Sequence, residues 1–285
     1  MSEVAARTGN EEIGRKVPPP LGKGELLAPG YWVVAPLNRG RVLDVYDVWS
    51  EERASRCIAK ILRPDRLEDR RARGGLLREG RILERLTHLH IVRAYETLER
   101  PRPVVILETL TGPTLTYIIV HRRRRLRLSS VVLLGLHLCS AMHYLHRQGL
   151  LHLDLKPSNI VSSLGLAKVL DLNLARPPGR GRRGVGTRQY MAPEQARGDL
   201  LTEATDVWGI GAVLFHAATG RPPFKAEAGR KYQQLERRAD SVRAHRRVPV
   251  AFATAVDRCL DPEPSRRPTV GELAELLNNL MPEQS

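Results

Sequence analysis

The feature of the sequence that most constrains the fold is a change of pattern at Thr111-Gly112-Pro113. Before this point, apolar runs typical of β-strands occur between about residues 31 and 62, as YWVVAPL, VLDVYDVW and CIAKIL. Residues 66–87 then show helical periodicity, and two further strand-like runs follow, HIVRAYE and PVVILETL. The first part of the chain is therefore predicted to form a small β-rich unit with one main helix.

Helical patterns dominate after this point. A buried helix face is indicated by apolar residues at steps of four, four and three, namely Leu134, Leu138, Met142 and Leu145. Further helical patterns cover residues 203–219, about 249–260 and 270–280. A hairpin is predicted around Gly165, between the runs NIVSS and LAKVLDL. We therefore predict an α+β chain in which a small β-rich part precedes a larger helical part.

The composition and the cysteines limit the class of protein. Hydrophobic residues make up 42% of the chain and aromatic residues only 5%, so a sizeable core must depend on Leu, Val, Ile and Ala. The three cysteines, Cys57, Cys139 and Cys259, are far apart and form no CxxC or Cys/His cluster. This pattern argues against a disulfide framework and a zinc site, and a reducing, cytoplasmic setting is expected.

We predict neither a membrane segment nor a signal peptide. No apolar run approaches the roughly 18 residues that cross a bilayer, and the longest candidate, VVLLGLHLCSAMHYL, is interrupted by histidines and a serine. Residues 1–24 are polar and Pro-rich and contain no signal-peptide core, so they are predicted to form a flexible tail. Nothing in the sequence indicates an oligomeric state.

The formal net charge of +15 can attract an anionic partner. Arginine supplies 39 of the 46 basic residues, but these are scattered through the chain in runs such as HRRRRLR and RGRR. Aromatic residues do not alternate with them, as a stacking platform for single-stranded nucleic acid requires. We therefore do not expect nucleic-acid binding. Two interpretations of the charge stay open, a dispersed solvated charge and a real anionic partner, such as an anionic lipid or an acidic protein.

The most informative stretch is His152-Leu153-Asp154-Leu155-Lys156-Pro157-Ser158-Asn159. It resembles the catalytic loop of protein kinases, H-R-D-L-K-x-x-N. The resemblance implies that Asp154 orients the substrate hydroxyl and takes its proton, and that Asn159 binds a magnesium ion. It also implies that Lys156 contacts the transferred phosphate, as in Ser/Thr-directed members. The full match is far more specific than an isolated HxD.

Further motifs follow in the order of that family, over roughly residues 30–281. Lys60, in Ile58-Ala59-Lys60, resembles the V-A-I-K lysine that holds the α- and β-phosphates, and Glu79 on the next helix is expected to pair with it. Asp171 corresponds to the D-F-G aspartate, whose carboxylate suits magnesium. GTRQYMAPEQ is close to bacterial eukaryotic-like Ser/Thr kinases, and its Glu194 is expected to pair with Arg267.

The resemblance implies Mg-ATP as the cofactor, with Mn²⁺ as an alternative ion. The adenine is expected to bond to backbone near Glu108-Thr109-Leu110, the predicted hinge between two lobes. The predicted nucleotide-contacting residues are Leu37, Gly40, Val45, Ala59, Lys60, Glu108, Leu110 and Val161. The predicted metal ligands are Asn159 and Asp171.

Two motifs depart from the family pattern. The glycine loop L-G-x-G-x-x-G-x-V reads LNRGRVLDV over residues 37–45 and keeps only Gly40. Because glycine permits close backbone approach and positive φ, we expect a stiffer loop and weaker nucleotide binding. The D-F-G motif reads Asp171-Leu172-Asn173, in which asparagine is the non-glycine residue best suited to a left-handed position. The substitutions at Leu172 and Asn173 are tolerable and keep the metal ligand, Asp171.

A third departure concerns regulation. Most relatives have an arginine before the catalytic aspartate, and a phosphorylated activation loop neutralises it, but this chain has Leu153. The activation segment before Glu194 includes LARPPGRGRRGVGT, and residues 172–186 contain no hydroxyl side chain. Thr187 resembles the threonine that contacts the catalytic aspartate and lysine. The loss of the arginine agrees with the loss of phosphorylatable residues from this segment. We therefore expect activity without activation-loop phosphorylation.

As a suspected member of the protein kinase superfamily, the chain is expected to have an N-lobe over about residues 25–110 and a C-lobe over about 111–281. We expect it to phosphorylate Ser or Thr in protein substrates. A basic strip in the activation segment either attracts acidic substrates or an acidic regulator, or is simply solvated; it consists of Arg176, Arg180, Arg182 and Arg183. The alternative is a pseudokinase scaffold with weak or no nucleotide binding, which does not need the complete catalytic set.

Overall fold

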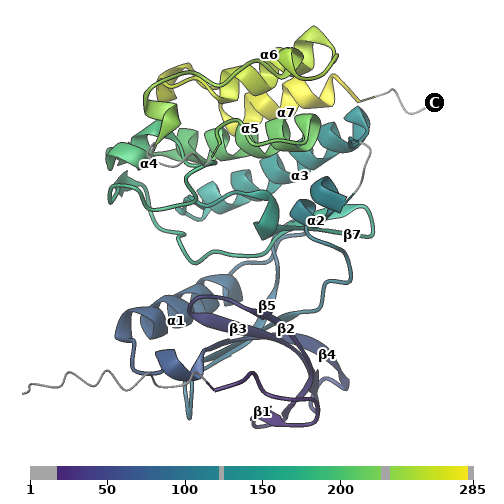
Figure 1. Cartoon of the computed structure of the whole chain (residues 1–285), viewed down its shortest axis with the longest axis vertical. Helices are drawn as coiled ribbons and strands as arrows, with labels where there is room; N and C mark the ends of the chain where they lie inside the picture. Colours follow the sequence, from purple (N-terminus) through teal and green to yellow (C-terminus); the bar gives the residue numbers. More distant parts are fainter. Residues whose placement is uncertain (1–17, 122–124, 226–231, 282–285) are drawn as a thin grey trace, which may run out of the picture.

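The structure is a computed structural model that describes residues 18–121, 125–225 and 232–281. These residues form two lobes, a smaller one built around a β-sheet and a larger helical one (Figure 1). The chain passes from the first to the second near Thr111-Gly112-Pro113, so the predicted change of architecture is confirmed. Residues 1–17, most of the predicted flexible tail, lie outside the described residues.

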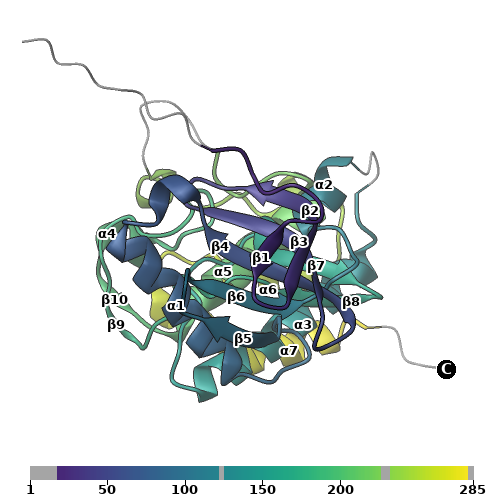
Figure 2. The same cartoon turned by 90° about the horizontal axis from the view of Figure 1, so that it is seen from below.

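The smaller lobe contains a six-stranded antiparallel sheet in the order β1-β2-β3-β4-β6-β5. Its strands are β1 (Leu26–Ala28), β2 (Tyr31–Arg39), β3 (Leu43–Ser50), β4 (Ser55–Leu62), β5 (Ala94–Leu98) and β6 (Val104–Glu108). Successive side chains of a strand point to opposite faces, and one face of this sheet forms a core around Tyr46, Val48 and Ala59. Helix α1 (Arg70–Glu84) packs on β4, β5 and β6, beside the sheet in Figure 2.

Helix α1 is shorter than the predicted helix over residues 66–87. Asp69 ends the preceding turn and caps the helix, because its carboxylate accepts hydrogen bonds from two amides of the first turn. Gly80 allows close packing on the sheet, since a Cβ there would lie 2.2 Å from Thr97 Oγ1. The helix thereby holds Glu79 against the smaller lobe with 1% of the residue exposed.

Residues 18–24, which the sequence assigns to the tail, lie against the smaller lobe. The amide of Leu21 donates to Tyr46 Oη at 3.0 Å, and the Leu21 side chain packs on the core. The carbonyl of Pro18 accepts a hydrogen bond from Arg39 Nη1 at 2.8 Å. The packed part of the chain therefore begins before residue 25.

A short hairpin and a β-bridge join the lobes. The predicted hairpin around Gly165 is confirmed as β7 (Ile160–Ser163) and β8 (Leu166–Val169). The strand predicted for HIVRAYE begins only at Ala94, because Ile91 and Val92 pair instead with Val169 of β8. This pairing ties the end of the smaller lobe to the hairpin of the larger one.

Helices build the larger lobe. They are α2 (Leu115–His121), α3 (Leu128–Arg147), α4 (Pro193–Arg197), α5 (Glu203–Thr219), α6 (Val250–Cys259) and α7 (Val270–Asn278). The bounds of α5 agree with the prediction, since Thr202 precedes it and Gly220 ends it in a left-handed conformation. The main core lies where α3 meets α5 and α7 (Figure 1). All three cysteines are buried and free, as expected.

Among the described residues, helix α3 is the one segment that meets the length and hydropathy of a membrane span. Its 20 residues are long and apolar enough by length and composition, with a mean hydropathy of 1.5. However, half of this stretch is buried inside the lobe, where α3 packs against α5 and α7. A core helix of a globular lobe satisfies the same criterion, so this one helix is weak support for a membrane span.

Candidate active site

Strand β4 and helix α1 bring together the first two predicted catalytic residues. Lys60 Nζ lies 2.8 Å from Glu79 Oε1, and the two side chains are 12% and 1% exposed. Burial alone would lower the pKa of Lys60, but the charges of Glu79 and Asp171 raise it above its usual value. Lys60 is therefore a fixed cation at the interface between the lobes.

Asp206, near the start of α5, anchors the predicted catalytic loop. The carboxylate of Asp206 accepts hydrogen bonds from the amides of His152 and Leu153, both at 2.8 Å. Burial lowers the pKa of His152, so its ring stays neutral, and its Nδ1 accepts the amide of Asp154 at 3.1 Å. The sequence predicts a helix over residues 203–219 but assigns no role to Asp206 near its start. Its signal was the motif Asp206-Val207-Trp208.

Leu153 adopts a left-handed conformation with φ of 66°, which is unusual for a branched side chain. Its backbone is held on both sides, by Asp206 through the amide and by Gln195 Nε2, which donates to the carbonyl at 2.8 Å. This strained residue directly precedes Asp154. The strain is thus located at the residue that sets the direction of the predicted catalytic carboxylate.

Asp154 is the centre of a compact polar network. Thr187 donates to Asp154 Oδ1 from its hydroxyl at 2.7 Å and from its amide at 3.1 Å. Lys156 Nζ lies 2.6 Å from Asp154 Oδ2 and 2.8 Å from Thr187 Oγ1. The expected contact of Thr187 with Asp154 and Lys156 is therefore present. It joins the activation segment to the catalytic loop.

Asn159 and Asp171, the predicted metal ligands, each keep an oxygen available. Asn159 Nδ2 donates to the carbonyl of Asp154 at 3.1 Å, which leaves its Oδ1 directed elsewhere. Asp171 Oδ1 accepts the amide of Asn173 at 2.8 Å, and among the described residues Oδ2 has no hydrogen-bond donor. Burial would raise the pKa of Asp171, but the charge of Lys60 lowers it below its usual value. Asp171 is therefore an anionic oxygen donor, as magnesium requires.

The altered D-F-G motif is built differently from the expectation. Leu172 fills an apolar slot with 1% exposure, and its amide lies 3.4 Å from Glu79 Oε1. Asn173, however, does not adopt the left-handed conformation for which asparagine is suited. Its carbonyl accepts a hydrogen bond from Arg78 Nη2 at 2.6 Å, which fixes this segment to α1.

One predicted nucleotide-contacting residue, Ala59, lies on the other face of the sheet from Lys60. Ala59 is fully buried in the core on the far face of the sheet, whereas Lys60 faces Glu79. Because neighbouring residues of a strand point to opposite faces, Ile58 shares the face of Lys60. In the register of V-A-I-K, Ile58 also occupies the alanine position. An isoleucine therefore lies beside Lys60 on this face of the sheet. Its side chain leaves less space there than the alanine of V-A-I-K would.

The other predicted nucleotide-contacting residues lie around the same interface. Val45 is the cross-strand partner of Lys60, and Val161 is buried in β7. Glu108 ends β6, and its carboxylate accepts hydrogen bonds from Lys168 and from the amide of Arg93. Leu110, two residues after Glu108, is half-buried. Leu37, at the outer end of β2, is 54% exposed.

The degenerate glycine loop is a short turn fixed by side chains. Arg39 and Asp44 face each other across β2 and β3 in a bidentate ion pair, at 2.9 and 2.8 Å. The amide of Gly40 donates to Leu43 at 2.8 Å, and Arg63 donates to the Gly40 carbonyl at 3.1 Å. The expected stiffness of the loop thus has a structural basis.

The activation segment follows a defined path over the larger lobe. Arg176 pairs with Leu151 through both backbone groups, and β9 (Gly179–Arg180) pairs with β10 (Leu200–Leu201). Leu153 lies between these anchors in an apolar cluster, which also contains Leu151, Leu174 and Leu201. The position of the missing arginine is therefore occupied by hydrophobic contacts.

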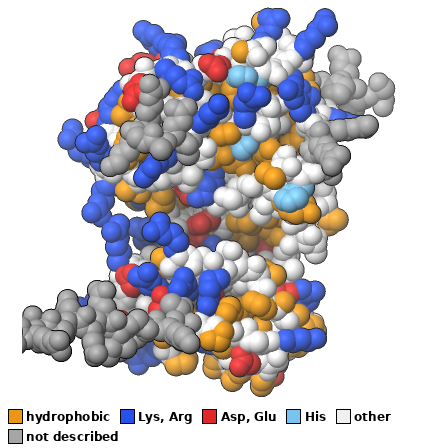
Figure 3. All heavy atoms as spheres, in the orientation of Figure 1, with side chains coloured by type: hydrophobic (Ala, Val, Ile, Leu, Met, Phe, Trp, Pro, Cys, Tyr) orange, Lys and Arg blue, Asp and Glu red, His pale blue; other side chains and the backbone are white. Residues whose placement is uncertain are grey.

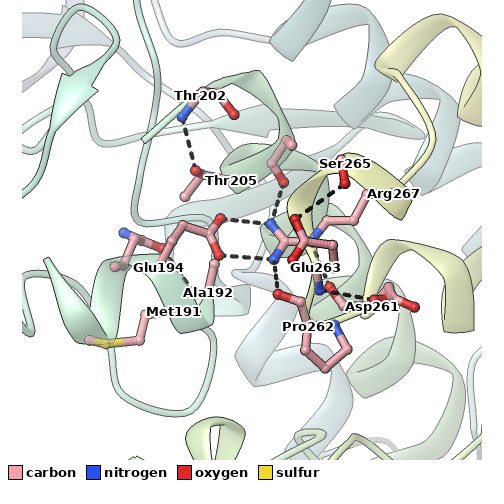
Figure 4. Close-up of polar contacts among 12 residues, drawn as sticks. Met191, Ala192, Glu194, Thr202, Thr205, Asp261, Pro262, Glu263, Ser265 and Arg267 are labelled. Carbon is pink, nitrogen blue, oxygen red and sulfur yellow. Dashed lines mark hydrogen bonds and ion pairs between the residues drawn. The ribbon is translucent and has the colours of Figure 1, made fainter. Parts of the chain in front are cut away.

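The predicted partnership of Glu194 and Arg267 is confirmed (Figure 4). Arg267 Nη1 and Nη2 lie 2.7 and 2.9 Å from the two oxygens of Glu194, and both side chains are almost completely buried. The guanidinium also stacks over Trp208 at 5.0 Å. This pair ties the end of the activation segment to the last part of the larger lobe.

Comparisons with known proteins agree with this geometry. A family model described as "Protein kinase domain" matches residues 31–278. Serine/threonine-protein kinase PknB of Mycobacterium tuberculosis is 34% identical over 182 residues, which cover 59% of this chain and 29% of that protein. The DNA damage-responsive serine/threonine-protein kinase RqkA of Deinococcus radiodurans is 31% identical over 265 residues, covering 88% of this chain and 39% of that protein.

A solved structure supports the fold. The kinase domain of Mycobacterium tuberculosis PknI superposes with a TM-score of 0.74 at 23% identity, covering 91% of this chain and 98% of that chain. The chain matches less than half the length of PknB and of RqkA. The expected two-lobed kinase fold is confirmed, and the chain belongs to the protein kinase family.

Proposed function

We propose that this chain is a serine/threonine protein kinase that transfers the γ-phosphate of Mg-ATP to protein hydroxyls in the cytoplasm. The observation that carries the proposal is the closed, buried ion pair between Lys60 and Glu79. A scaffold does not need such a pair, because two desolvated charges are costly unless they serve a purpose. The names of the curated relatives support the same activity.

The donor set fits a magnesium ion. An anionic oxygen from Asp171 and an amide oxygen from Asn159 are the ligands that this ion accepts, and Lys60 adds a positive charge for phosphate oxygens. Held by Asp171 and Asn159, the ion would supply positive charge that stabilises the phosphate groups during transfer. The fixed position of Lys60 keeps this region preorganised for a polyphosphate.

The acceptor side depends on Asp154. Its carboxylate is fixed by Lys156 and Thr187, so it is aligned before a substrate arrives. In this proposal, Asp154 orients the acceptor hydroxyl and receives its proton, and the Lys156 ammonium compensates negative charge on the transferred group. The polar network thus has a role for each of its members.

The geometry also supports activity without phosphorylation of the activation segment. Leu153 is anchored by apolar neighbours and needs no counter-charge. Thr187 is the first hydroxyl residue after residues 172–186, and it already donates to Asp154. A phosphate on Thr187 would place negative charge beside that carboxylate. A stoichiometric, activating phosphate at Thr187, detected by mass spectrometry, would contradict this part of the proposal.

The central test is a γ-phosphate transfer assay on a generic Ser/Thr acceptor. Asp154→Asn is expected to lower kcat at least about 100-fold, because it removes the general base while keeping the size of the side chain. A thermal shift with Mg-ATP, measured on both proteins, reports nucleotide binding separately. If wild type and variant are equally inactive and Mg-ATP gives no shift, the scaffold interpretation replaces the enzyme. Comparison of phosphosites in cells with either protein would then identify substrates.

A further inference from the structure

A second pocket lies apart from Lys60 and Asp171, between the start of α1 and the activation segment. Its volume is about 540 Å³, which is within the usual range for a ligand site. Helix α1 forms one wall, and the activation segment with β10 forms the other. Neither the catalytic residues nor the predicted nucleotide-contacting residues line it.

The rim of this pocket carries four guanidinium groups. Arg71 and Arg78 belong to α1, while Arg176 and Arg182 belong to the activation segment. Within the described parts of the chain, none of the four has a carboxylate partner; Arg78 and Arg176 donate only to backbone carbonyls. Figure 3 shows basic side chains gathered at the same side of the gap between the lobes.

The acidic residue of the pocket does not neutralise these cations. Asp69 also lines the pocket, but its Oδ1 accepts the amides of the first turn of α1. Four cations therefore face one carboxylate that is already hydrogen-bonded. Such an excess of positive charge at a concave surface favours an anionic occupant.

The floor of the pocket is apolar and contains no aromatic residue. Leu153, Leu174 and Leu201 form it, and Val185 contributes a side chain that is 37% exposed. Nucleic acid would find no ring for stacking here, and its phosphates would leave the leucines uncovered. A peptide can place an apolar side chain on the leucines and its negative groups on the arginines.

We propose that this pocket docks an acidic segment of a partner protein, with an apolar residue on the leucine floor and carboxylate or phosphate groups on the arginine rim. Such a segment would contact α1 and the activation segment together. Because α1 also carries Glu79, docking would stabilise the pair with Lys60. This regulatory consequence rests on the proposed kinase function, whereas the docking itself does not.

The test measures binding to the full chain without nucleotide. The probe is a fluorescein-labelled peptide with a central leucine flanked by glutamates, followed by fluorescence anisotropy at about 0.15 M ionic strength. The double variant Arg71→Glu/Arg182→Glu is expected to lower the affinity at least about tenfold, since it removes charge-assisted hydrogen bonds. The matched control Arg243→Glu changes an exposed arginine of the larger lobe and is expected to bind like wild type.

Two further binding measurements separate the contribution of the apolar floor from that of the arginine rim. Val185→Ser is expected to weaken binding of the leucine peptide but not of a peptide with serine in its place. A peptide with one phosphoserine in place of a glutamate tells which anion binds better, and tighter binding of either peptide supports docking. Equal weakening by Arg71→Glu/Arg182→Glu and Arg243→Glu, or no binding of any peptide, would overturn the proposal. So would equal competition by single-stranded DNA. An inactive kinase with normal peptide binding would refute the catalytic function alone.

Discussion

Removing Arg267 gives a sharp test of how the larger lobe holds the activation segment. In Arg267→Met, the carboxylate of Glu194 loses both hydrogen bonds from the guanidinium, although its side chain is only 4% exposed. Methionine fills much of the volume, so the change removes charge more than packing. The variant leaves a buried carboxylate unpaired and also removes the hydrogen bonds that Arg267 donates to the carbonyls of Ala204, Asp261 and Pro262.

The expected cost follows from this burial. Breaking a buried pair by removing one partner costs about 3–5 kcal/mol, because the remaining charge is uncompensated. The lost contact with Trp208 adds about 1 kcal/mol. Against a total stability of about 5–15 kcal/mol, this is a large fraction. At about 2–4 °C for each kcal/mol in a chain of this size, Tm should fall by roughly 10 °C or more.

The assay is thermal and urea unfolding, followed by circular dichroism. Arg258→Met is the control, since Arg258 is an exposed arginine of α6 and its loss should leave Tm within about 2 °C of wild type. The double variant Glu194→Met/Arg267→Met should be more stable than Arg267→Met, because no charge is left unpaired. A loss below about 1 kcal/mol in Arg267→Met, or a double variant less stable than the single one, would refute the reasoning.

Two further predictions concern the activation segment and pH. Leu153→Arg should lower the free energy of unfolding by about 2–3 kcal/mol, because it removes a buried leucine and adds a cation to the pocket that Arg176 and Arg182 line. A urea midpoint equal to that of wild type would contradict this prediction. Burial lowers the pKa of His216 from 6.5 to about 4, so the unfolded chain binds its proton first as pH falls. Stability should therefore decrease between about pH 6.5 and 4, and His216→Gln should flatten this decrease in urea titrations at several pH values; an unchanged slope would contradict it.

Local signals in the sequence predicted the elements that depend on near neighbours. Helix α5 has its predicted bounds because the residues on either side of it end the helical pattern, and Gly220 turns left-handed. The hairpin around Gly165 also forms from adjacent residues. The order of motifs predicted that Lys60 and Glu79 would pair, and that Thr187 would reach Asp154.

Only the tertiary structure decided which face of each element meets the site. Strand alternation puts Ile58 on the same face as Lys60, but the packing of α1 on the sheet decides that this face meets Glu79 while Ala59 enters the core. Likewise, the left-handed Leu153 depends on bonds from Asp206 and Gln195, which are distant in sequence. The arginine-rimmed pocket needs α1 and the activation segment together. Motifs and local periodicity thus determined the identity of the chemistry, whereas long-range packing determined the shape of its surroundings.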